Sequence, residues 1–261
     1  MFNKKISTFS IALQSAVRSQ DFYLEVLGLP KSKNTSSNNS KIYEDNGSSV
    51  FGTNEKPETR YFLTNPERPA LVLLTSQKNP VMTQQDIFTI LKIKSGSILN
   101  RTQHRLLGHK LINIHKIQKG KTFQLVWVAT DKAFEILNLN RQPRHIIGSD
   151  FHAFIVESVN GHFKLLGWQT QCEFQLPDGS FIDLLARRGQ ETVCIEVGLS
   201  PLEKEVHNAL KIFSSGLNPN KILHVVQNSK DQKKLEQLLR AEEKLDSHAE
   251  KIEITLAGNY I

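Results

Sequence analysis

Three strand-like segments separated by short turns place the strongest constraint on the fold of this chain. They are 168–176 "WQTQCEFQL", 181–186 "FIDLLA" and 192–198 "TVCIEVG". Apolar, aromatic and β-branched residues dominate them, as is typical of strands. A turn is predicted at "PDGS", because Pro177 fixes φ and Gly179 accepts a positive φ. A second turn is predicted at "RRGQE". These segments therefore predict three consecutive strands joined by tight turns.

Helical patterns flank the three strands. Ser149 is a candidate cap for a helix through "DFHAFIVESVNGHFKLL". After the strands, Ser200, Pro201 and Glu203 form a capping-box pattern at the start of a second helix. Its apolar stripe is expected at Leu202, Val206, Ala209, Leu210 and Phe213. Three more elements are predicted: a buried strand "KILHVVQ", an amphipathic helix "DQKKLEQLLRAEEKL" and a short strand "KIEITLAG". Together they predict a mixed sheet covered by helices.

Two of the apolar strands contain a carboxylate, Asp183 and Glu196. Side chains alternate between the faces of a strand, so the length of the connecting loop decides whether the two acids share a face. An even loop places them opposite or diagonal to each other, and an odd loop separates them. Two alternatives stay open: exposure of one acid at the sheet rim, or pairing with Arg187 or Arg188.

If the acids share a face, they repel each other and burial raises their pKa values. A bound divalent cation removes both problems, and Mg²⁺ or Mn²⁺ accepts carboxylate ligands together with water. Such a site can activate water for hydrolysis of a phosphodiester bond. We therefore consider Asp183 and Glu196 candidate metal ligands.

Composition limits the class of protein. The chain has 261 residues, a net charge of +7 and a pI of about 9.3, which favours a nucleic-acid partner but also occurs in many soluble proteins. Two cysteines make neither a disulfide scaffold nor a zinc site. The sequence has no apolar run of membrane-spanning length, so we predict a cytoplasmic protein with no membrane partner.

The first half of the chain divides into two parts. Residues 1–65 predict one helix at about 9–27 and a linker rich in Ser and Asn, to which we assign no function. In 66–140, Thr83 is a candidate cap for a helix through "QQDIFTILKI". Ser97 is a candidate cap for a second helix through "ILNRTQHRLLGHKLINIHKI". A turn "KGKT", a strand "FQLVWVAT" and a Thr-capped helix "DKAFEIL" follow.

This order of elements over residues 81–138 resembles a winged helix. The resemblance implies that the second helix enters the DNA major groove and that the hairpin, or wing, touches the backbone. Candidate DNA-binding residues are Arg101, His104, Arg105 and Lys110 on that helix and Lys119 and Lys121 on the wing. Basic residues are also common on solvated helix faces, and winged helices also dock proteins. Residues 139–149 are the expected joint to a second domain.

The second domain, residues 149–261, resembles the PD-(D/E)XK, or restriction-endonuclease-like, superfamily over about residues 149–240. The resemblance implies three catalytic carboxylates, Asp183, Glu196 and Glu173, the first two as ligands of Mg²⁺ or Mn²⁺. Pro177 and Asp178 spell the first two letters of the motif but belong to a turn. The two-domain order is similar to proteins of plasmids and integrative elements, including the replication-relaxation group.

The chain departs from that motif at Gly198, where the superfamily has a lysine that activates the attacking water. Lys204 and Lys211 are expected to face away from the acids, and we interpret His152 as a surface histidine. The sequence thus predicts an α/β (α+β) protein, with a winged helix before a nuclease-like domain.

Three hypotheses for the function follow. The first is a Mg²⁺-dependent endonuclease-like protein of a mobile-element or defence setting. The second is a catalytically degenerate DNA-binding regulator or replication and transfer accessory protein. The third is a subunit of a larger DNA-processing complex whose winged helix docks a partner protein, with the charged helix over 231–245 as a candidate interface. RNA remains open as an alternative to DNA.

Overall fold

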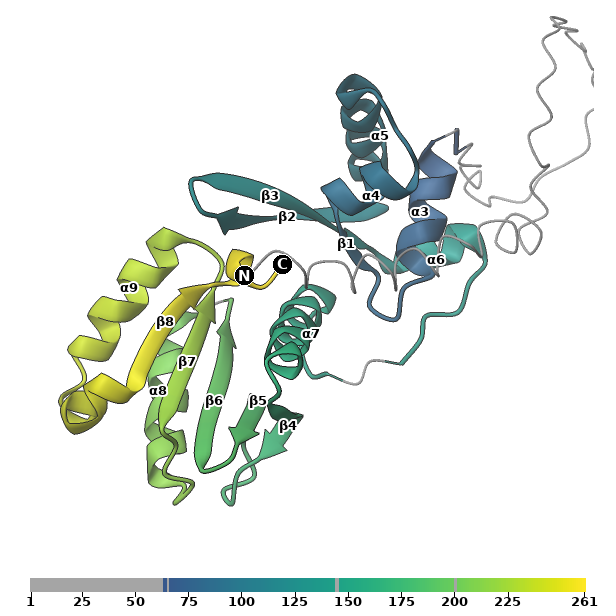
Figure 1. Cartoon of the computed structure of the whole chain (residues 1–261). Helices are drawn as coiled ribbons and strands as arrows, with labels where there is room; N and C mark the ends of the chain where they lie inside the picture. The colour runs from purple at the N-terminus through teal and green to yellow at the C-terminus, as the bar shows by residue number, and fades with distance from the viewer. Residues whose placement is uncertain (1–62, 65, 144–145, 200) are drawn as a thin grey trace, which may run out of the picture. The chain divides into compact units, whose positions relative to one another are not determined.

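The computed structural model of the protein describes residues 63–64, 66–143, 146–199 and 201–261. It is an α+β structure with a three-stranded antiparallel sheet and a five-stranded mixed sheet (Figure 1), which confirms the predicted fold class. The helix predicted near residues 9–27, the polar linker and the cap at Ser200 lie outside the described residues. No helix in the described ranges is both long and apolar enough to cross a membrane.

The first group of elements contains the three-stranded sheet, in the order β1-β3-β2. Its elements are α3 (Glu67–Thr75), β1 (Val81–Thr83), α4 (Gln84–Ile90), α5 (Gly96–Gly108), β2 (Ile112–Lys119), β3 (Thr122–Ala129) and α6 (Asp131–Leu137). The predicted cap of α4 is confirmed, since the Asp86 amide donates to the Thr83 hydroxyl at 3.1 Å. The helices pack on fully buried Trp127 of β3.

The predicted extent of α5 is wrong. The helix begins at Gly96 after Ser95, ends at Gly108, and is followed by Lys110 with a φ of 59°. The residues predicted to continue the helix form β2, which pairs with β3 from Ile112↔Ala129 to Lys119↔Thr122. Pairing with β3 overrides the local helix propensity of these residues, because the strand gains ladder hydrogen bonds and buries one face.

The second group of elements contains the five-stranded sheet, in the order β4-β5-β6-β7-β8. Its elements are α7 (Asp150–Leu165), β4 (Gln169–Gln175), β5 (Phe181–Arg188), β6 (Glu191–Gly198), α8 (Leu202–Ser214), β7 (Lys221–Val226), α9 (Ser229–Arg240), η1 (Glu243–Lys251), β8 (Ile252–Leu256) and η2 (Ala257–Asn259). The pairs β4–β5 and β5–β6 are antiparallel, and β6–β7 and β7–β8 are parallel. Ser149 caps α7, as predicted, by accepting from the His152 amide at 3.1 Å.

The two faces of the five-stranded sheet have separate cores, with α7 on one face and α8 and α9 on the other (Figure 1). The α7-side core includes Ile155, Val159, Leu184, Ala186, Ile195, Val197, Leu223 and Val225. The α8-side core includes Ile182, Leu185, Cys194, Ala209, Ile212, Ile222, Val226 and Leu235. These two layers fix the positions of α7 and α8 relative to the central strand β6.

Strand β2 also makes hydrogen bonds to the segment that follows β7. The Gln118 amide donates to the Gln227 carbonyl at 3.1 Å, and the Gln227 side chain donates to the Lys116 carbonyl at 2.6 Å. Gly258 of η2 lies so close to β2 that a Cβ at this position would be 2.2 Å from the Gln118 carbonyl oxygen. This contact therefore depends on glycine for space.

We expect Gly258→Ala to lower the free energy of unfolding by about 1–3 kcal/mol, because the added methyl group meets backbone that has to move. Urea unfolding of the full chain measures the change. Gly161→Ala in α7 is a matched control: a Cβ there meets nothing within 4 Å. It should be neutral or stabilising by about 0.5–1 kcal/mol. Equal effects of the two changes would contradict the assigned close approach.

Candidate functional site

The candidate site lies where β5 and β6 separate. Their antiparallel pairs run from Arg188↔Glu191 to Leu184↔Ile195. Beyond this point β5 remains paired with β4, and β6 remains paired with β7. The connecting loop has two residues, Gly189 and Gln190, so the even loop needed to bring the two acids together is present. Asp183 and Glu196 are the first residues past the last pair on their two strands.

The Asp183 carboxylate bridges the separation of the strands. Its Oδ2 accepts a 2.7 Å hydrogen bond from the Val197 amide of β6 and lies 3.1 Å from Nε2 of His152 on α7. The side chain is 20% exposed, and neither contact uses Oδ1. Asp183 thus replaces a strand carbonyl as the acceptor of a β6 amide and keeps a second oxygen for another ligand.

Glu196 is a buried carboxylate, with the residue only 3% exposed. Its Oε2 accepts a 3.0 Å hydrogen bond from Asn208 of α8, whereas its Oε1 is buried without a hydrogen-bond partner among the described residues. Burial raises its pKa well above the usual 4.5, and the negative charges of Asp183 and Glu205 raise it further. The hydrogen bond from Asn208 partly opposes this shift.

Glu205 of α8 fills the space beside Gly198. A Cβ at Gly198 would be 2.9 Å from Cγ and 3.1 Å from Cδ of Glu205. The φ of Gly198 is outside the left-handed region, so this glycine is required for space and not for backbone conformation. The carboxylate of Glu205 therefore lies where the side chain of a residue at position 198 would begin.

His224 completes the polar group beneath α8. It pairs with Glu196 in the register of β6 and β7 and is fully buried. Its Nδ1 is 3.6 Å from Oε2 of Glu205, beyond hydrogen-bond distance, and both ring nitrogens lack a hydrogen-bond partner in the described chain. Buried polar atoms without partners are costly in a folded protein. Such atoms are grouped here on Glu196, Glu205 and His224.

His152 contacts Asp183, so the prediction of a surface histidine is wrong. Its side chain is 15% exposed. Burial by itself lowers its pKa, but the hydrogen bond and charge of Asp183, together with the charges of Glu173 and Glu205, raise the pKa above 6.5. His152 is therefore a partner that orients Asp183.

Glu173 of β4 lies between the pairs Cys172↔Leu184 and Phe174↔Ile182, opposite Asp183. Its φ is 52°, and its Oε1 accepts from the Ile147 amide at 2.9 Å. Burial raises the pKa of Glu173, and the charge of Asp183 adds to this shift. The carboxylate is thus near Asp183 but already engaged, and its role as a ligand stays a prediction.

Side-chain alternation is broken in both β4 and β5 at the level of Glu173. Cys172 packs with the α7-side core and Phe174 with the α8-side core, although two-residue spacing normally shares a face. In β5, Ile182 and Leu184 are divided in the same way, so the predicted alternation in this strand is wrong. The break in alternation occurs at Asp183, where the strands separate.

Sequence reasoning missed Glu205 and His224. In α8 the buried positions are Leu202, Glu205, Ala209 and Ile212, a spacing of three and four that includes the acid. In β7, His224 alternates with Ile222 and Val226 of the α8-side core. Both signals were present as polar residues at apolar positions of the pattern.

The described residues contain no group of three His, Cys, Asp or Glu side chains already arranged to hold a metal ion. The predicted ligands Asp183 and Glu196 remain a pair, each with a carboxylate oxygen not used by the contacts above. Two carboxylates and several waters are a coordination that Mg²⁺ commonly accepts. The donor set is therefore compatible with Mg²⁺ or Mn²⁺.

All six predicted DNA-binding residues are exposed. Arg101 and His104 are exposed on α5, and Lys121 is exposed in the loop between β2 and β3. These three side chains are accessible to a phosphate backbone.

The other three basic candidates have different settings. Arg105 pairs at 2.8 Å with Glu67, which is buried, and so connects α5 to α3. Lys110 lies after the end of α5, which corrects its predicted place on the helix. Lys119 at the end of β2 donates to the Ile261 carbonyl oxygen. Their contacts indicate structural roles for Arg105 and Lys119.

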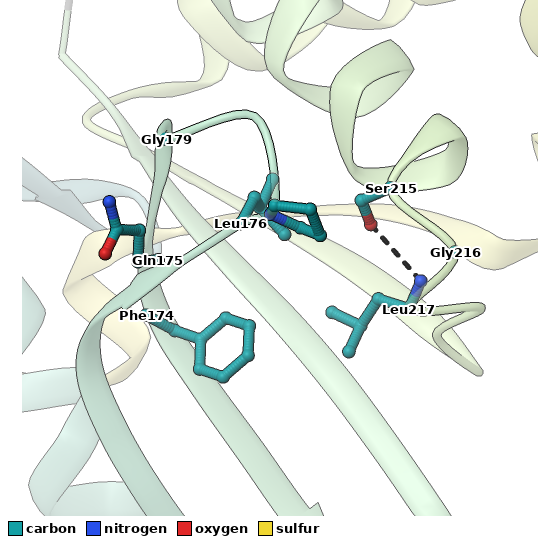
Figure 2. A pocket seen from close by; sticks show the side chains of 8 residues that line it. Phe174, Gln175, Leu176, Gly179, Ser215, Gly216 and Leu217 are labelled. Atoms are coloured by element: carbon teal, nitrogen blue, oxygen red, sulfur yellow. Dashed lines mark hydrogen bonds between the residues drawn. The ribbon is translucent and has the colours of Figure 1, made fainter.

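An open pocket lies between the end of β4 and the segment after α8 (Figure 2). Its lining consists of Phe174, Gln175, Leu176, Pro177, Gly179, Ser215, Gly216 and Leu217. The Leu217 amide donates to the Ser215 hydroxyl at 3.2 Å. No ionisable side chain lines this pocket, so it lacks the groups needed for acid–base or metal chemistry.

A comparison with protein-family models gives no match, and a comparison with curated proteins gives none. The resemblances to a winged helix and to the PD-(D/E)XK superfamily therefore stay predictions. The argument for function comes from the geometry of the side chains.

We expect Gly198→Ala to lower the free energy of unfolding by about 1–3 kcal/mol, because the new methyl group overlaps Glu205. In a Glu205→Ala background the same change should cost less, since the obstructing side chain is gone. Chemical unfolding of the wild type, both single variants and the double variant measures this coupling. Strictly additive effects would show that Glu205 does not occupy the space beside Gly198.

The buried acid predicts a pH dependence of stability. Because the pKa of Glu196 is raised in the folded protein, the folded state binds more protons than the unfolded state above the unfolded pKa of 4.5. The free energy of unfolding should therefore fall as the pH rises above 4.5 and through the raised pKa of the folded state. His152, whose pKa is also raised, contributes in the same direction as the pH rises through its folded pKa.

Glu196→Gln should flatten this decrease in metal-free buffer, as measured by urea unfolding across the pH range. Glu203→Gln serves as the control, because the pKa of Glu203 is lowered by Lys234 and its titration lies below this pH window. Identical slopes for the wild type and Glu196→Gln would exclude Glu196 as a source of the pH dependence.

Proposed function

We propose that this protein binds DNA and cleaves phosphodiester bonds with the help of a divalent cation. The observation that carries the proposal is the separation of β5 and β6 at Asp183 and Glu196. Each of these acids keeps an oxygen outside the hydrogen bonds described above, and their charges interact. Adjacent carboxylates of this kind favour a cation, because it offsets both their repulsion and their burial.

Asp183 and Glu196 would hold the cation, which when bound lowers the pKa of a coordinated water and offsets negative charge on a phosphate. The surrounding residues orient these two ligands. His152 and the Val197 amide fix Oδ2 of Asp183, and Asn208 fixes Oε2 of Glu196. Such supporting contacts commonly set the geometry and basicity of metal ligands.

DNA is the proposed substrate because the chain has a net charge of +7 and presents Arg101, His104 and Lys121 at the surface. Arg and Lys contacts to phosphates release counterions, so binding should weaken steeply with salt. Proteins of a larger DNA-processing complex are further proposed partners, in a mobile-element or defence setting.

One observation favours a second function, a non-catalytic DNA-binding regulator or replication and transfer accessory protein. Gly198 provides no lysine, and α8 presents Glu205 beside it. A site without the lysine that usually activates the attacking water would then be retained for binding DNA and not for cleavage. This alternative expects salt-sensitive DNA binding with no cleavage in Mg²⁺ or Mn²⁺.

The experiment compares cleavage of supercoiled and linear DNA by the full chain in Mg²⁺ and Mn²⁺. We expect Asp183→Asn to reduce cleavage by about a hundredfold or more, as for other groups that act on transition-state charge. DNA affinity, measured at several salt concentrations, should stay nearly unchanged. Asp178→Asn is the matched control, since Asp178 is an exposed turn residue that bonds Ser180.

Cleavage by the wild type and by Asp178→Asn, with loss in Asp183→Asn, supports a nuclease. Equal cleavage by all three proteins would assign the activity to another site or a contaminant. Salt-sensitive binding without any cleavage would support the regulator instead. Absence of DNA binding would reject both functions.

A further inference from the structure

Glu205 is the feature of the site that the family resemblance does not account for. It is 5% exposed, and its Oε2 is buried without a hydrogen-bond partner in the described chain. Its Cγ and Cδ occupy the space that a side chain at position 198 would need. A carboxylate is thus built into the place where the resembled motif has the base of a lysine side chain.

Two further buried groups near Glu205 also have polar atoms without partners. Glu196 has a buried Oε1 without a partner, and the charge of Glu205 acts on Glu196. His224 is 0% exposed, has two ring nitrogens without hydrogen-bond partners, and lies 3.6 Å from Oε2 of Glu205. Unpartnered polar atoms on three buried side chains favour a ligand-binding role for this place, since native proteins rarely leave such groups unsatisfied.

Charge identifies the class of that ligand. Exchanging a lysine for a glutamate makes a site more negative by two charges, so this site attracts a cation more strongly than one with the usual motif. Carboxylate oxygens from Asp183, Glu196 and Glu205 are hard ligands of the kind that Mg²⁺ and Mn²⁺ prefer. An anion or an apolar ligand would leave two buried carboxylates unbalanced.

We propose that Glu205 supplies a third carboxylate to the divalent-cation site of Asp183 and Glu196, beside His224. This inference deepens the proposed function and rests on it for the first two ligands. The three acids come from β5, β6 and α8. The described residues hold no group of three such side chains already arranged around a metal ion, so the proposal requires Glu205 to move toward Glu196 when the cation binds.

Binding would therefore tie α8 to the sheet. A ligand that binds the folded state alone raises the unfolding temperature, so the cation should stabilise the wild type more than a variant without the third carboxylate. This provides a measurement that does not depend on DNA cleavage.

The test titrates Mn²⁺ into the full chain by calorimetry and records the Mn²⁺-induced shift in unfolding temperature. Glu205→Gln preserves the size of the side chain and removes its charge. We expect its Kd for Mn²⁺ to rise about tenfold or more, since even supporting residues of metal sites cost 10–100-fold when removed. The temperature shift should decrease in parallel.

Glu203→Gln is the control on the same helix, because Glu203 is 58% exposed at its side chain and pairs with Lys234. It should change the Kd by less than about twofold, as expected of an exposed pair. Glu205→Asp, which keeps the charge, should retain more Mn²⁺ affinity than Glu205→Gln. It also serves as the second variant if Glu205→Gln does not fold.

The outcomes separate this inference from the proposed function. If the wild type binds Mn²⁺, Glu205→Gln binds it more weakly and neither cleaves DNA, the inference stands and the nuclease function fails. If the wild type cleaves DNA and Glu205→Gln binds Mn²⁺ like the wild type, the nuclease stands and the inference is overturned. If the wild type binds no Mn²⁺, both are overturned.

Discussion

The Val197 amide donates its hydrogen bond to the Asp183 side chain, because β5 and β6 separate after the pair Leu184↔Ile195. The rest of the site depends on this separation. Strand β5 stays with β4, β6 stays with β7, and the two acids past the last pair lie between α7 and α8. In a continuous ladder, backbone groups of the neighbouring strand would make such hydrogen bonds in place of a side chain.

The site places several ionisable groups in a largely apolar setting. Removing an ionised carboxylate from water costs several kcal/mol for each group, which is comparable with the net stability of a domain. The supporting contacts from Asn208 to Glu196 and from His152 to Asp183 offset part of this cost. The remaining cost is what a bound cation would remove, so burial and function are linked through the same carboxylates.

Much of the fold was predictable because local signals and tertiary packing agree. Thr83 and Ser149 cap their helices as their positions indicated, and the turn with Pro177 and Gly179 separates two strands. The prediction failed for 112–117, which were predicted as helix but pair with β3 as part of β2. In the site, Asp183 and Glu196 were predictable as polar residues in apolar strands, whereas the contact of His152 with Asp183 needed the packing of α7.

By itself, the sequence determined the order of most helices and strands, the two strand acids, and the absence of a lysine at Gly198, because these follow from local composition and spacing. Only the tertiary structure decided which groups meet. Loop parity and strand register placed Asp183 across from Glu196, side-chain alternation was broken at the level of Glu173, and helix packing put Glu205 in the space beside Gly198. These contacts join residues distant in sequence, and their geometry depends on how α7 and α8 pack on the sheet.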